Sequence, residues 1–163
     1  MLIFRRLDLT LAALAFSATA ASAGVCPDGA VAALDTLPAD VMADLETAVG
    51  VPFAELAQAH GAVTMTELTL SDTTATYCVD FNTSMTCSNG IAVCAIGVVA
   101  PAQHPSVLLM EAAHGLTTTQ GDDWAGITLS VDRADGVTTS LYDYCDGIYA
   151  ERCTSPTEAS TNG

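Results

Sequence analysis

The sequence of 163 residues contains no lysine, and its four basic residues are all arginine. The 19 acidic residues outnumber them and give the chain a formal net charge of −15. Proteins that bind nucleic acid or anionic membrane surfaces need basic patches that displace counterions. The composition therefore argues against both of these partners, and the lack of lysine excludes Schiff-base chemistry.

Sequence motifs of the common catalytic sites are absent as well. The chain has no nucleophile elbow GxSxG, no HExxH, no GxGxxG and no phosphate loop GxxxxGK[ST]. It also lacks CxxC and CxxCH pairs, which argues against zinc knuckles and covalent haem. We find no catalytic signature in the sequence and lean toward a protein that is not an enzyme.

The N-terminal segment, residues 1–23, has the pattern of a secretory signal peptide. It begins with the basic residues Arg5 and Arg6, continues with the apolar stretch Leu9–Ala18, and ends in the small residues Ala-Ser-Ala before Gly24. The apolar stretch is shorter than the roughly 20 residues that a membrane-spanning helix needs. We therefore expect export to a periplasm or to the exterior, without membrane insertion.

Six cysteines follow the signal peptide, and their even number predicts disulfides in an exported chain. The sequence does not fix which cysteines pair. We favour two local bonds and one long-range bond, and the three pairs are Cys87–Cys94, Cys145–Cys153 and Cys26–Cys78.

Three segments have the apolar spacing of amphipathic helices. The first begins at Pro38 and ends at Val49, and the second runs over 52–60. The third covers Ser106 to His114, where Gly115 supplies a cap. The sequence thus predicts two helices near the N-terminus and one in the middle of the chain.

The remaining segments have the alternation of β-strands. Residues 63–70 and 74–81 form one predicted hairpin, and residues 127–131 and 137–144 form another. The apolar run over 91–100 predicts a strand that is covered on both faces. The predicted fold class is a small, disulfide-stabilised α+β domain, whose three helices pack on a mostly antiparallel sheet.

This domain is predicted to span residues 24–153, and the polar segment 154–163 is predicted to be a disordered tail. Within the domain, the segment LAQAHGAVTMT at 56–66 resembles MEAAHGLTTTQ at 110–120. Each precedes a predicted hairpin that ends in a Tyr-Cys pair. A duplicated helix-and-hairpin unit and the repeated use of a His-Gly helix cap both explain this similarity.

Aromatic and acidic residues gather in the C-terminal half and form a candidate binding surface. Aromatic rings surrounded by carboxylates suit contact with a cationic protein or peptide. Half-buried positions in a sheet are the alternative explanation for the aromatic residues. The candidate surface consists of Trp124, Tyr142, Tyr144, Asp122, Asp123 and Asp143.

A metal site is a second candidate. On the predicted third helix Glu111 and His114 are three residues apart and could touch, and His104 precedes them. With an aspartate from the following loop, these side chains could hold zinc or copper. The turn over 132–136 does not fit an EF-hand loop, because Val131 falls at the first ligand position. Weak calcium binding by surface carboxylates is a further alternative.

These observations lead to one functional prediction and two alternatives. We expect an exported, acidic, non-enzymatic module that binds or inhibits a cationic partner. The first alternative is a metal-binding protein or a metal-dependent hydrolase that uses the histidine and glutamate residues. The second is a structural protein of the cell envelope.

Overall fold

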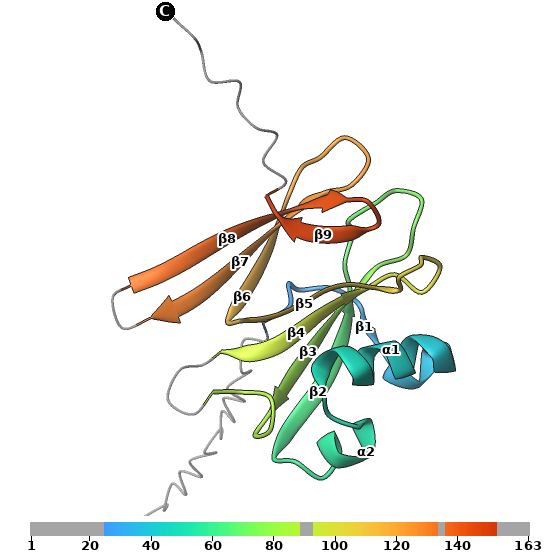
Figure 1. Ribbon diagram of the computed structural model, residues 1–163, viewed down its shortest axis with the longest axis vertical. Coiled ribbons are helices and arrows are strands. Elements are labelled where there is room, and N and C mark those ends of the chain that lie inside the picture. Colours follow the sequence, from blue (N-terminus) through green and yellow to red (C-terminus); the bar gives the residue numbers. More distant parts are fainter. Residues whose placement is uncertain (1–24, 89–92, 134–135, 153–163) are drawn as a thin grey trace, which may run out of the picture.

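The computed structural model describes residues 25–88, 93–133 and 136–152. Figure 1 shows two β-sheets that face each other, with the helices on the far side of the larger sheet. The predicted signal peptide, the predicted tail and Cys153 lie outside the described residues. No helix in the described ranges has the length and apolar character to cross a membrane.

The larger sheet is a five-stranded antiparallel meander in the order β1-β2-β3-β4-β5. A 3-10 turn and two helices lie between its first two strands. The elements are β1 (Val31–Ala32), η1 (Leu34–Thr36), α1 (Ala39–Val49), α2 (Phe53–Leu56), β2 (Gly61–Glu67), β3 (Tyr77–Thr83), β4 (Cys94–Val99) and β5 (Val107–Ala113).

The smaller sheet continues the chain as a four-stranded antiparallel meander in the order β6-β7-β8-β9. Only His114 separates β5 from β6, so the chain passes from one sheet to the other at a tight corner. The elements are β6 (Gly115–Thr119), β7 (Gly126–Arg133), β8 (Gly136–Cys145) and β9 (Ile148–Glu151).

Helix α1 confirms the sequence prediction for this segment. Val41 and Leu45, one helical turn apart, are buried against the larger sheet. Gly50 ends the helix in the left-handed conformation, with φ of 76°, and its N–H donates to the Glu46 carbonyl at 2.9 Å.

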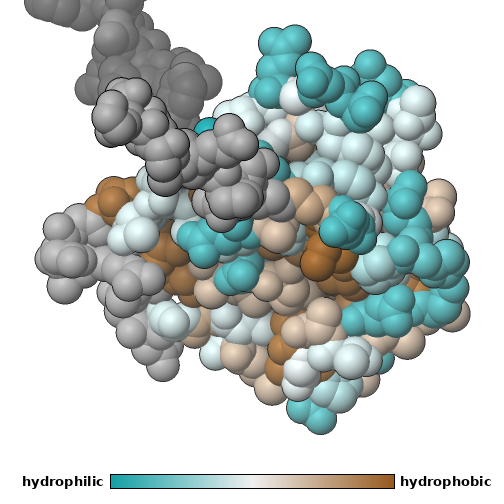
Figure 2. Space-filling model, turned by 45° about the horizontal axis from the view of Figure 1, so that its top comes forward, coloured by the Kyte–Doolittle hydropathy of each residue, from teal (hydrophilic) through white to brown (hydrophobic). Residues whose placement is uncertain are grey.

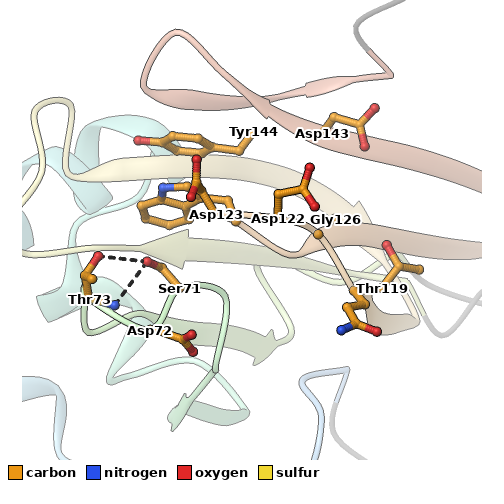
Figure 3. Close-up of a pocket in the computed structure, with 12 residues that line it drawn as sticks. Ser71, Asp72, Thr73, Thr119, Asp122, Asp123, Gly126, Asp143 and Tyr144 are labelled. Atoms are coloured by element: carbon orange, nitrogen blue, oxygen red, sulfur yellow. Dashed lines mark hydrogen bonds between the residues drawn. The ribbon is translucent and has the colours of Figure 1, made fainter.

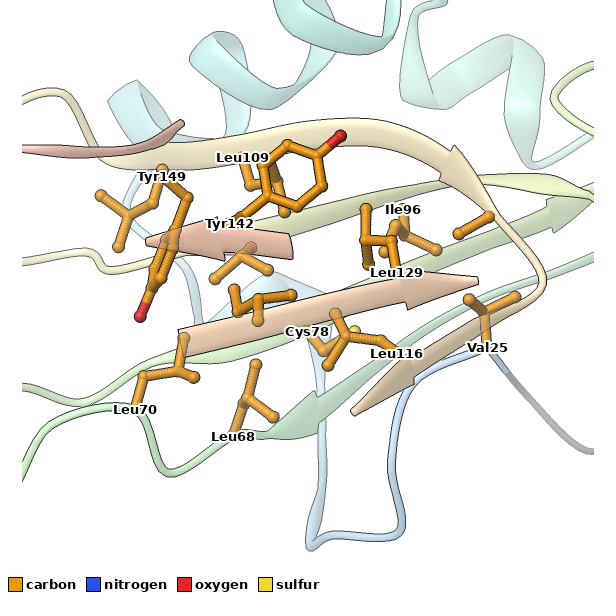
Figure 4. Close-up of a cluster of buried hydrophobic side chains, with 14 of the residues drawn as sticks. Val25, Leu68, Leu70, Cys78, Ile96, Leu109, Leu116, Leu129, Tyr142 and Tyr149 are labelled. Atoms are coloured by element: carbon orange, nitrogen blue, oxygen red, sulfur yellow. The ribbon is translucent and has the colours of Figure 1, made fainter. Parts of the chain in front are cut away.

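The strand alternation of the larger sheet divides the core into two layers. Val79 and Phe81 point toward α1, while Cys78 and Asp80 point toward the smaller sheet. The layer between the sheets is shown in Figure 4, and its labelled side chains come from both sheets, from Val25 and from Leu68 and Leu70 in the connection between β2 and β3. The smaller sheet therefore has one face in the core and the other toward solvent.

The predicted mid-chain helix over 106–114 is wrong, because this segment is strand β5. Every residue of β5 except Leu108 has a register partner on β4, from Val107 opposite Val99 to Ala113 opposite Cys94. As a strand, the segment buries Leu109 in the layer between the sheets and packs Met110 on the helix side. A helix would offer a single apolar stripe, so burial on both faces outweighs helical propensity here.

The predicted second helix is also wrong in extent, because α2 is a single turn over Phe53–Leu56. Strand β2 begins at Gly61, which has φ of 119°, and this strand pairs with β3. The His-Gly pair at positions 60 and 61 thus leads into a strand, and the pair at 114 and 115 joins two strands. Both explanations of the similarity are therefore wrong: the second segment contains no helix to duplicate, and Gly61 and Gly115 begin strands and do not cap helices.

The predicted α+β fold class is therefore corrected to a mostly antiparallel β fold with one helix of 11 residues in the described part of the chain. Both predicted hairpins are confirmed, as β2 pairs with β3 and β7 pairs with β8. The apolar strand over 91–100 is confirmed as β4 from Cys94 onward, and residues 89–92 lie outside the described part.

Two of the three predicted disulfides are confirmed. Cys26 is bonded to Cys78, which ties the N-terminal segment to β3. Cys87 is bonded to Cys94, which closes the connection between β3 and β4. Cys145 is also disulfide-bonded, while its predicted partner Cys153 lies outside the described residues.

Candidate functional site

A pocket of about 800 Å³ lies where a connection of the larger sheet meets a connection of the smaller one. Its walls are the turn at 71–73 between β2 and β3, the loop at 119–126 between β6 and β7, and residues 143–144 of β8. Figure 3 shows the two connections on opposite sides of the pocket, with β8 above them.

The loop between β6 and β7 is held from both sides at Ala125. The Ala125 N–H donates to the Leu70 carbonyl at 2.7 Å, and the Ala125 carbonyl accepts from the Tyr149 hydroxyl at 2.6 Å. Gly121 allows the loop to fold back, since a Cβ at this position would lie 2.0 Å from the Trp124 carbonyl oxygen. These contacts hold the loop in place on both sides of Trp124, the residue that follows Asp122 and Asp123.

The Trp124 ring stacks on the Tyr144 ring. Their ring centroids are 4.0 Å apart and their planes are within 11° of parallel. Tyr149 packs edge-on against both rings, at centroid distances of 6.4 and 5.5 Å. Burial, and to a lesser degree Tyr144, raises the pKa of Tyr149, which keeps its hydroxyl protonated as a donor to the loop. Trp124 and Tyr144 therefore form an aromatic wall of the pocket, and the buried Tyr149 supports them from behind.

Four aspartates line the pocket beside this wall, and all four side chains are exposed. Asp122 and Asp123 come from the tip of the β6–β7 loop, Asp143 from β8 and Asp72 from the facing turn. Hydroxyl groups of Ser71 and Thr73 lie beside Asp72, 3.2 Å from each other. No lysine, arginine or histidine is among the lining residues, so the charge of the pocket is wholly negative.

Gly126 keeps part of the pocket floor open. It pairs with Thr119 of β6, and the next strand brings Asp143 beside it. A Cβ at position 126 would lie 2.6 Å from the Thr119 hydroxyl oxygen and 3.5 Å from an Asp143 carboxylate oxygen. The two oxygens therefore flank a gap that any larger residue would fill.

The structure brings together five of the six residues predicted as a binding surface: Asp122, Asp123, Trp124, Asp143 and Tyr144 all line the pocket. Tyr142 does not, because its side chain is 9% exposed and packs in the layer between the sheets. Burial, with the nearby carboxylates of Glu111 and Glu151, raises the pKa of Tyr142. Tyr142 is therefore a core residue and is removed from the candidate site.

The candidate metal ligands were His104, Glu111 and His114. The helix that was predicted to align Glu111 with His114 is strand β5 in the structure. Glu111 is exposed on strand β5, His114 is half-buried at the corner after it, and His104 is exposed in the preceding loop. The described ranges contain no group of three or more His, Cys, Asp or Glu that could hold a metal ion, so the structure gives this hypothesis no support.

Sequence reasoning missed the half of the site that comes from the larger sheet, namely residues 71–73. They are separated by about 50 residues from the loop that they face, and no sequence pattern connected the two. It also missed Thr119 and Gly126, whose register opposite each other follows only from the strand pairing. The one available sequence signal was Gly126 at the start of an apolar strand, because a glycine there often marks a close approach of other atoms to the backbone.

The chain matches no known protein family, no curated protein and no solved structure in searches of each. The function is therefore argued from the pocket itself.

Proposed function

We propose that the chain is an exported, non-enzymatic protein that binds a cationic protein or peptide in the pocket between the two sheets. The observation that carries this proposal is the combination of four aspartates with the stacked rings of Trp124 and Tyr144 in one concave site. Carboxylates attract ammonium and guanidinium groups, and aromatic faces and edges contact their alkyl stems and planar heads. A lysine or arginine side chain of the partner is the group that this pocket suits.

Export supports this role, and it is itself part of the proposal. The two confirmed disulfides fit an oxidising compartment, and the N-terminal pattern predicts processing to a periplasmic or secreted form. The hydrophilic side chains in Figure 2 gather along the edges of the face shown, with small hydrophobic patches between them. The formal net charge of −15 attracts a basic partner over long range.

The single tryptophan of the sequence gives a direct assay, because Trp124 is part of the pocket wall. We expect an oligo-lysine or oligo-arginine peptide to change the Trp124 emission at low salt, and an oligo-glutamate peptide of equal length to leave it unchanged. Binding should weaken as ionic strength rises, since exposed charges are screened beyond about 10 Å at 0.1 M salt.

A charge-matched pair of variants tests whether the pocket or the net charge is responsible. Asp122→Asn with Asp123→Asn removes two pocket charges, while Asp28→Asn with Asp35→Asn removes two exposed charges elsewhere. We expect the pocket variant to bind at least about fivefold more weakly, which corresponds to about 1 kcal/mol, and the control variant to bind nearly normally. Equal weakening in both variants would contradict a specific pocket.

A further inference from the structure

Asp80 is a buried carboxyl group that the pocket does not use. It lies on the central strand β3, points into the layer between the sheets and is 2% exposed. One carboxylate oxygen, Oδ2, accepts a hydrogen bond from the Val25 N–H at 2.9 Å. The other, Oδ1, has no hydrogen-bond partner. A buried oxygen without a partner is costly, and a buried charge without a counterion is more so.

The Thr66 hydroxyl is a second buried oxygen without a partner in this region. Thr66 lies opposite Cys78 on the neighbouring strand β2, and Asp80 follows two residues after Cys78 on the same face. The Thr66 hydroxyl can donate or accept, whereas an ionised carboxylate only accepts, so Oδ1 of Asp80 is the atom that lacks a donor. Burial raises the pKa of Asp80, and the Val25 N–H partly offsets this rise.

Val25 is held firmly beside these acceptors. Its carbonyl accepts from the Leu116 N–H at 3.0 Å, and the next residue, Cys26, is bonded to Cys78. Figure 4 shows Val25 close to Leu116 at the edge of the core between the sheets. Standard bond lengths place the nitrogen of residue 24 within about 3.7 Å of the Val25 nitrogen. Because the Val25 N–H is bonded to Asp80, the residue before Val25 is one peptide unit away from this carboxyl group.

We propose that Asp80 is the binding site for the α-ammonium group of Gly24, which exists only after the signal peptide has been removed. This inference depends on the export that we propose above, but not on the pocket. Hydrolysis of the Ala23–Gly24 peptide bond consumes one water and leaves a carboxylate on Ala23 and an ammonium on Gly24. The new group supplies a positive charge and three N–H donors where the amide supplied one neutral N–H.

Under this proposal, removal of the signal peptide adds a stabilising interaction that the unprocessed chain lacks. Before cleavage, the nitrogen of residue 24 is a neutral amide and cannot supply a counterion to Asp80. After cleavage, an ion pair between the chain terminus and the central strand secures the N-terminal segment across both sheets. The processed chain should be more stable than a chain of the same sequence whose N-terminus is blocked.

The absence of lysine makes this inference unusually easy to test, because the α-amine is the only primary amine of the processed chain. The chain is exported from a bacterial host, its N-terminus at Gly24 is verified by mass spectrometry, and acylation by an amine-reactive reagent is followed from pH 6 to 10. We expect the folded chain to react at least about tenfold more slowly at pH 7 than the urea-unfolded chain, since each unit of increase in the amine pKa reduces the free amine about tenfold.

Two variants separate an ion pair from simple shielding. Asp80→Asn keeps the shape but removes the charge, and insertion of one alanine before Gly24 keeps the amine but moves it away. Both should react nearly as fast as the unfolded chain. If Asp80→Asn does not fold, the pH profile of the unaltered chain decides, because an ion pair shifts the amine pKa and shielding slows the reaction equally at every pH. Equal rates in the folded and unfolded chain, protection that persists in Asp80→Asn, or processing at another residue would each overturn the proposal.

Discussion

The two confirmed disulfides should differ in their contribution to stability, because they close loops of different length. Cys26–Cys78 spans 52 residues and Cys87–Cys94 spans 7. If a disulfide stabilises by restricting the unfolded chain, these separations correspond to about 4 and about 2 kcal/mol. The long-range bond should therefore be worth about 2 kcal/mol more than the local bond.

The comparison uses Cys26→Ala and Cys87→Ala, which replace the half-buried partner of each pair and leave the buried partner, Cys78 or Cys94, in place. The difference then does not include a new cavity at a buried cysteine. Unfolding in urea, followed by Trp124 emission, gives the free energy of unfolding of each variant. Measurements below pH 7 keep the freed thiol protonated and slow disulfide exchange. An equal or larger loss in Cys87→Ala would refute the loop-length reasoning.

Three further changes have defined outcomes. Leu45→Ala should lower the free energy of unfolding by about 2–5 kcal/mol in urea, since Leu45 is fully buried between α1 and the larger sheet. Tyr149→Phe should cost about 0.5–1.5 kcal/mol in the same assay, because it removes the hydrogen bond to the Ala125 carbonyl. In a processed chain with an acetylated N-terminus, Asp80 should make stability fall as the pH rises above 3.8 toward its raised folded-state pKa, because the folded chain keeps a proton that the unfolded chain has lost. Asp80→Asn should remove that contribution from a pH series of urea unfolding curves.

The sequence predicted those elements whose signals are local. Pro38 and Gly50 bracket α1, and the alternating residues of both hairpins specify strands regardless of their surroundings. The segment over 107–113 carries no such local signal, because VLLMEAA has good helix formers and an apolar spacing that suits a helix. Its pairing with β4 and its burial on two faces decide its conformation, and both depend on residues far along the chain.

The candidate site was also predicted only in part. The error concerns Tyr142, and its cause is again strand pairing. Tyr142 and Tyr144 share one face of β8, so alternation alone gives them the same environment. The register separates them: Tyr142 lies opposite Ile127 within the pairing of β7 and β8, where the larger sheet covers it, whereas Tyr144 lies beyond the first residue of β7. At that point the β6–β7 loop replaces the strand as neighbour and brings Trp124 against Tyr144. The candidate surface thus begins where the pairing of β8 with β7 ends, although β8 continues to pair with β9. Alternation along β8 does not show this boundary, and the sequence therefore grouped Tyr142 with Tyr144.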